Sequence, residues 1–207
     1  MDINDKQKDK LREIGNIGAG NASNALSKMT DEKIDIGFPG IEVHEIRDIP
    51  EEIGNRSKIH SLVRVEVHVE RNENESIYLG TLMLVLDRRS AKILAGHLLG
   101  DTENIDIEQQ LTESEESALK ETGNILTGST LSAMTEWVDL KLKEGVPDIK
   151  TDMLGAVMDE ILLKMAQHED EALLFQTKFN FKKDLNSYFI FLFSRKGRNL
   201  ILEKLSV

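Results

Sequence analysis

Two stretches of this chain, LREIGNIGAGNASNALSKM at residues 11–29 and LKETGNILTGSTLSAMTEW at residues 119–137, decide how it folds. They align at a constant offset of 108 residues, and seven of the nineteen aligned positions are identical: Leu, Glu, Gly, Asn, Ile, Gly and Ala. In each stretch, apolar and small residues recur three and four positions apart, which is typical of a helix with one buried face. Because self-similarity at a fixed offset indicates a repeated structural unit, we expect two similar halves.

The order helix, proline-containing turn, strand hairpin, helix is predicted in both halves. The strands are indicated by alternating apolar and polar residues, most clearly over 59–71. Two end signals support the helices: Thr112 and Glu115 have the spacing of a capping box, and Gly100 is a typical helix stop. The expected elements are helices over 5–29, 88–100, 112–137, 152–167 and 197–205, an extended segment over 33–47, and strands over 59–71, 77–86, 171–182 and 187–195.

These elements predict an α+β fold. We expect one domain over 1–207, built of two repeats at about 1–102 and 103–207. An antiparallel β-sheet should be flanked by helices and arranged with pseudo-two-fold symmetry. The hairpins of the two halves should merge into one sheet, and the two long helices that carry the repeated stretch should be exposed.

Each repeated helix places one carboxylate and one carboxamide on the same side. Glu13 and Asn16 are three residues apart, as are Glu121 and Asn124, and side chains at this spacing share a helix face. Such a pair could simply face solvent. Its presence in both copies favours a functional role, because asparagine has low helix propensity and folding does not require it at either place.

The glycines beside these pairs are costly, since each glycine inside a helix loses about 1 kcal/mol relative to alanine. Close approach of another backbone or of a partner is the usual reason for such glycines. A dinucleotide-binding loop is the other interpretation of GNIGAGNASN at 15–24. That motif needs a preceding strand, and here the helical pattern already begins near residue 5.

Composition excludes several classes of function. The chain has 207 residues and no cysteine, which rules out disulfides, thiolate metal sites and cysteine nucleophiles. The net charge of −11 argues against nucleic acid as a partner. Five scattered histidines form no paired metal motif, so no metal site is predicted. With no apolar stretch of about 18 residues and no signal-peptide core, we expect no membrane span and a cytoplasmic location.

These residues resemble the CheC family of chemotaxis phosphatases, which is related to CheX and FliY. The family motif is Asp or Ser, three residues, Glu, two residues, Asn, twenty-two residues and Pro. The first copy reads Asp9, Glu13, Asn16, Pro39 and the second reads Ser117, Glu121, Asn124, Pro147. The resemblance covers essentially the whole chain, and two complete motifs without appended domains favour a CheC-like protein over CheX or FliY.

The resemblance implies a hydrolase that removes the phosphate from the phospho-aspartate of the response regulator CheY. Asn16 and Asn124 would align the attacking water, and Glu13 and Glu121 would dock to the regulator's lysine. The chain would need no cofactor of its own, because the regulator carries the Mg²⁺. The remaining motif residues have lesser expected roles: contact or capping for Asp9 and Ser117, and shaping of the turn after the helix for Pro39 and Pro147.

Two other functions remain open at this stage. The chain could act mainly as an adaptor that binds phosphorylated CheY and the receptor deamidase CheD, with little catalysis. It could also be a structural component of a flagellar switch, although it has no appended domain that such a role would favour.

Overall fold

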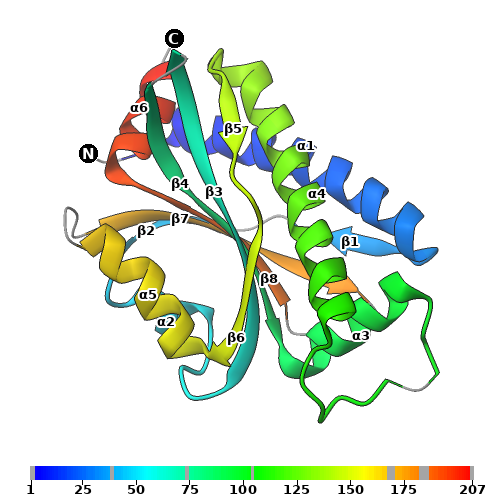
Figure 1. Cartoon of the computed structure of the whole chain (residues 1–207). Coiled ribbons are helices and arrows are strands. Elements are labelled where there is room, and N and C mark those ends of the chain that lie inside the picture. The colour runs from blue at the N-terminus through cyan, green and yellow to red at the C-terminus, as the bar shows by residue number, and fades with distance from the viewer. Residues whose placement is uncertain are drawn as a thin grey trace.

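The computed structural model describes residues 3–37, 40–72, 75–103, 105–166, 171–181 and 187–205. Helices and strands alternate in the same order in both halves (Figure 1). The first half contains α1 (Asp5–Thr30), β1 (Ile34–Ile36), β2 (Gly40–Glu45), α2 (Ile49–Ile53), β3 (Ile59–Asn72), β4 (Glu75–Asp87) and α3 (Arg88–Leu99). The second half contains α4 (Glu113–Val138), β5 (Leu142–Glu144), β6 (Asp148–Met153), α5 (Leu154–Ala166), β7 (Glu171–Phe181), β8 (Ser187–Phe193) and α6 (Arg195–Leu205).

Strands from both halves form one sheet, in which the pairings between described residues are antiparallel. Its order is β1-β7-β8-β4-β3-β5, with β2 also paired to β7 and β6 also paired to β3. The two hairpins meet at its centre, where Met83 of β4 lies opposite Ile190 of β8, so the predicted merging of the hairpins is confirmed. Replacing each strand by its counterpart in the other half gives β5-β3-β4-β8-β7-β1, which is the same order read from the opposite edge of the sheet. The α+β class is confirmed, whereas common descent of the halves and their boundary near residue 102 stay predictions.

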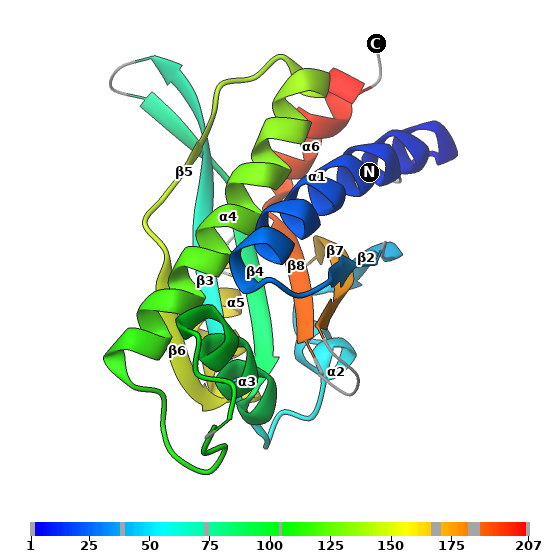
Figure 2. The same ribbon diagram turned by 90° about the vertical axis from the view of Figure 1, so that its right-hand side faces the viewer.

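Each face of the sheet carries its own apolar core. Successive residues of a strand point to opposite faces, so Leu62 packs in one core and Val63 in the other. Helices α1, α3, α4 and α6 cover one face, and the smaller α2 and α5 cover the other (Figure 2). The two long helices therefore lie on the same side of the sheet.

Both long helices begin with a capping box. Asn4 caps α1 together with Gln7, and Thr112 caps α4 together with Glu115, as its spacing predicted. Such boxes satisfy backbone N–H groups that have no partner within the helix. Helix α3 ends at Gly100, whose φ of 77° is left-handed, so this predicted helix stop is confirmed as well.

Three elements were not predicted from the sequence. They are the short helix α2 and the strands β5 and β6. The helix expected over 152–167 begins two residues later, because Asp152 and Met153 pair with β3 as the end of β6. All but one of the β6 residues are exposed, so this strand shows no apolar alternation by which it could have been recognised.

Candidate functional site

Helices α1 and α4 pack directly against each other, and a glycine allows their close approach. A Cβ added to Gly18 would lie 3.0 Å from the Cα of Thr130, so only glycine fits without displacing a helix. On α4, Gly123 fulfils a similar need, since an added Cβ would lie 2.6 Å from the side chain of Val63 on β3. Packing thus explains these two glycines. It does not explain Gly20, where an added Cβ would meet nothing within 4 Å.

The first Glu/Asn pair lies on the outer face of α1. Glu13 and Asn16 are both exposed, whereas their neighbours Ile14 and Gly15 are buried. Asp9, one turn earlier, is exposed and lies 3.4 Å from Arg12 in a surface ion pair. Pro39, the last residue of this motif, lies outside the described residues. The face presented to solvent therefore carries the carboxylate and the carboxamide that the sequence predicted.

The second pair occupies the matching place on α4. Ser117 and Glu121 are exposed and Asn124 is partly exposed, whereas Thr122 and Gly123 are buried. Pro147 is partly buried in the segment between β5 and β6 and directly precedes Asp148. Neither asparagine is buried in the core, which is a condition that any role at a partner surface must meet.

An open hollow of about 620 Å³ lies between the C-terminal half of α4 and strand β5. Its lining includes Gly128, which is one turn beyond Asn124 on the same helix face, and Glu144 from β5. A Cβ added to Gly128 would lie 3.6 Å from the Oε2 of Glu144. Desolvation by burial raises the pKa of Glu144, even though part of this side chain remains exposed.

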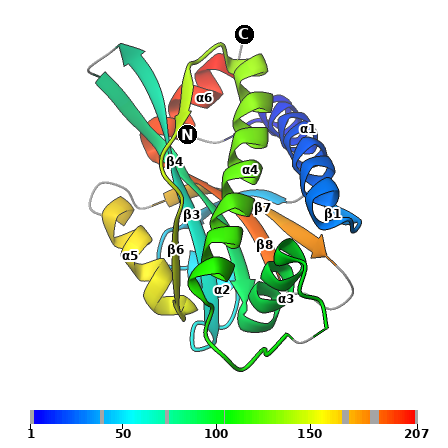
Figure 3. The ribbon, with the colours of Figure 1, turned by 45° about the vertical axis from the view of Figure 1, so that its right-hand side comes forward.

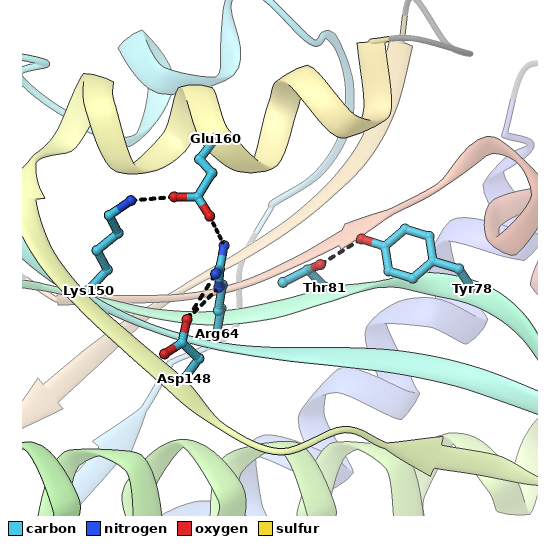
Figure 4. Close-up of polar contacts among 6 residues, drawn as sticks. All are labelled: Arg64, Tyr78, Thr81, Asp148, Lys150 and Glu160. Atoms are coloured by element: carbon cyan, nitrogen blue, oxygen red, sulfur yellow. Dashed lines mark hydrogen bonds and ion pairs between the residues drawn. The ribbon is translucent and has the colours of Figure 1, made fainter.

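A cluster of charged side chains fixes the start of β6, just after Pro147 (Figure 4). Arg64 on β3 donates hydrogen bonds from Nε and Nη2 to Oδ2 of Asp148, at 3.1 and 2.9 Å. Its Nη1 donates at 3.0 Å to Glu160 on α5, and Lys150 also donates to Glu160. We name these four residues the Arg64 cluster. The sequence alone does not reveal this cluster, because the meeting of Arg64 and Asp148 depends on the register of β3 against β6.

Two further properties bear on the kind of chemistry. Among the residues that the structure describes, no group of three or more His, Asp or Glu side chains is placed to hold a metal ion. No helix in the described ranges is long and apolar enough to cross a membrane. Each Glu/Asn pair offers one anionic acceptor and one neutral group that both donates and accepts hydrogen bonds. Such a pair suits docking to a cationic partner group together with orientation of a small polar molecule.

The same fold is found in crystal structures of FliY from Thermotoga maritima and of the FliM middle domain from H. pylori. Residues 7–43 match the CheC-like family. The CheY-P phosphatase CheC of Bacillus subtilis (strain 168) is 32% identical over 177 residues, which are 84% of this chain and 80% of that protein. This chain belongs to the CheC-like family.

One further relative supports the assignment, and one solved structure shares the fold. The flagellar motor switch phosphatase FliY of Bacillus subtilis (strain 168) is 29% identical over 201 residues, or 90% of this chain. The chain matches only 50% of the length of that protein. The crystal structure of Thermotoga maritima FliY has the same fold, with a TM-score of 0.75 and 20% identity over 100% of this chain and 98% of that one.

Proposed function

We propose that this chain hydrolyses the aspartyl phosphate of CheY. The observation that carries the proposal is the presence of the same Glu/Asn pair, accessible to a partner, on each of two matching helices. The 32% identity to a CheY-P phosphatase over most of both chains supports the choice of substrate. Asn16 is exposed and Asn124 is partly exposed, as contact with a partner's phosphoryl group requires.

In this proposal the reaction needs little chemistry from the phosphatase. Phosphoryl transfer depends mainly on positioning and charge stabilisation, and the substrate regulator supplies Mg²⁺, the phosphoryl group and a lysine. The carboxamide of Asn16 or Asn124 accepts a hydrogen bond from a water and holds it in line with the Asp–O–P bond. The water attacks phosphorus and the P–O bond to the aspartyl oxygen breaks. The carboxylate stays on CheY, and inorganic phosphate leaves with the oxygen and the protons of the water.

Glu13 and Glu121 have a docking role in this proposal. Each forms an ion pair with the regulator's active-site lysine, which orients the helix on its partner. Asp9 and Ser117 extend the same helix faces by one turn, and Pro147 shapes the turn after the second helix. The receptor deamidase CheD remains a proposed second partner.

The test is the decay of phosphorylated CheY with this protein present in substoichiometric amounts. Wild type should turn over many regulator molecules, and Asn16→Ala combined with Asn124→Ala should abolish that turnover. The double variant should still bind CheY activated with beryllofluoride. Asn21→Ala is a matched control, because it removes an exposed asparagine of α1 that lies five residues, or about 140°, from Asn16.

Two outcomes contradict the proposal. Full activity of the double variant would show that the asparagines do not align the water. Stoichiometric protection of the phosphate, without turnover by wild type, would instead indicate an adaptor that binds phosphorylated CheY and CheD.

A further inference from the structure

The segment that precedes the proline of the second motif exposes an apolar side chain almost completely. Val146 is 90% exposed, the largest value among the large hydrophobic residues that the structure describes. Single exposed apolar residues are common on protein surfaces. Val146 differs from such residues in its position beside the second Glu/Asn pair and in the way its backbone is held.

Its position follows from the course of β5 and β6, which run beside α4 in the opposite direction (Figure 3). Glu144 lies over Gly128, and Val146 comes two residues later. At the other end, Gly123 lies against Val63 of β3, which pairs with Ile149. Val146 comes between Glu144 and Ile149, so it lies between the levels of Gly128 and Gly123, beside the turn of α4 that begins with Asn124.

The backbone on both sides of Val146 is anchored. The N–H of Gly145 donates to the carbonyl of Glu66 on β3 at 2.8 Å, and a Cβ on Gly145 would lie 3.3 Å from that oxygen. On the other side, Arg64 holds Asp148 through two hydrogen bonds. An exposed apolar side chain on an anchored backbone loses little conformational freedom on binding, which favours its use as a contact.

Among the described residues of the first half, the position after the motif proline has no charged anchor. There the residue that follows the motif proline is Gly40, which pairs with Gln176 of β7, whereas Asp148 pairs with Arg64 of β3. Gly40 has no side chain with which to form an ion pair. The Arg64 cluster is therefore specific to the second motif.

We propose that Val146 is an apolar contact for phosphorylated CheY at the second motif, held in place by the Arg64 cluster. This inference rests on the proposed function, because it takes CheY as the partner that Asn124 faces. In the bound state Val146 packs against the regulator beside its active site, while Glu121 and Asn124 reach the lysine and the water. Val146 is then a docking residue, and Arg64 is a positioning residue that acts through Asp148.

The experiment uses the full chain with Asn16→Ala, so that turnover of phosphorylated CheY depends on the second motif. Adding Val146→Ser should raise KM about tenfold and leave kcat within twofold, because the lost burial weakens docking rather than the chemistry. Leu163→Ser in the same background is the matched control. Leu163 is 65% exposed but lies on α5, across the sheet from α4, and its replacement should leave KM unchanged.

Arg64→Met in this background tests the positioning role. Arg64→Met should raise KM, as Val146→Ser does. In a chain that already carries Val146→Ser, it should raise KM little further. A purely structural role of Arg64 would instead give independent, additive effects on KM.

Three results would overturn the inference. One is an unchanged KM for the Val146→Ser variant. Another is an equal rise of KM when Val146→Ser is combined with Asn124→Ala instead of Asn16→Ala, because the effect would then not belong to the second motif. The third is complete loss of turnover with Asn16→Ala alone, which would show that the regulator does not use this site. Each differs from full activity of the double asparagine variant, which contradicts the proposed function itself.

Discussion

Lys92 on α3 and Glu115 in the first turn of α4 form an ion pair of 2.8 Å that is almost closed off from solvent, with side-chain exposures of 6% and 13%. Glu115 is also the capping-box residue of α4 and accepts a hydrogen bond from the N–H of Thr112 at 2.7 Å. Burial alone would raise the pKa of Glu115, but the hydrogen bonds from Lys92 and Thr112 outweigh it and hold the pKa below its usual value. In α1 the matching residue is Gln7, whose neutral amide donates to the carbonyl of Leu202 on α6.

The two capping boxes predict how removal of the Lys92 charge can be compensated. Lys92→Met leaves the Glu115 carboxylate almost buried without its cation, so it should lower the free energy of unfolding by about 3 kcal/mol. Adding Glu115→Gln removes the second charge and copies the neutral box of α1. The double variant should therefore be more stable than Lys92→Met alone. Urea unfolding of both variants checks this. A double variant that is no more stable than Lys92→Met alone would contradict it.

Much of the fold could be predicted because its long elements carry strong periodic patterns. Helix α1 repeats apolar and small residues at helical spacing, and β3 alternates in register with its burial. Strand β6 was missed, because DIKTDM is mostly exposed and no apolar face marks it. Met153 fits the apolar period of α5, so the sequence pattern places Asp152 and Met153 in the helix rather than in β6.

The candidate site was predictable only in part, for a physical reason. The Glu/Asn pairs lie three residues apart on one helix, so local spacing alone places Glu13 beside Asn16. The pairing of Arg64 with Asp148 and the level of Val146 beside Asn124 depend on strand register and on the packing of α4 along β5. Contacts between distant parts of the chain are not encoded in local spacing.

Stability should depend on pH through Glu160. The hydrogen bonds from Lys150 and then Arg64 lower the pKa of Glu160 from 4.5 to about 2. A carboxylate with a lowered pKa stabilises the fold above its unfolded pKa, and this contribution is lost as the pH falls through the folded value. Glu160→Gln should therefore be less stable than wild type at pH 7, and the difference should shrink steadily below about pH 4.5.

Urea unfolding between pH 7 and pH 3 measures this dependence. Lys150→Met removes one of the two partners of Glu160, so it should bring the pKa of Glu160 in the folded protein closer to its unfolded value. In a chain with Lys150→Met, the effect of Glu160→Gln on the free energy of unfolding should therefore disappear over a narrower pH range. A difference that stays constant from pH 7 to pH 3 would show that Glu160 acts through packing rather than charge.

Two glycines of α1 should respond to alanine with opposite signs. Gly18→Ala forces a Cβ to within 3.0 Å of the Thr130 backbone, so it should separate α1 from α4 and cost about 2 kcal/mol. Gly20→Ala meets nothing within 4 Å and should raise the free energy of unfolding by up to about 1 kcal/mol, through helix propensity. Chemical unfolding of each variant gives the signs, and stabilisation by Gly18→Ala would contradict the packing of the two helices.

The final prediction separates docking from chemistry at the second motif. In a chain carrying Asn16→Ala, Glu121→Gln should raise KM for phosphorylated CheY about fivefold, because an exposed ion pair contributes up to about 1 kcal/mol. The change should leave kcat nearly constant and make KM less sensitive to salt, since a neutral amide forms no screened charge pair. Asn124 remains in this variant to align the water. If kcat fell while KM stayed constant, Glu121 would stabilise the transition state selectively, and its assignment to docking would be wrong.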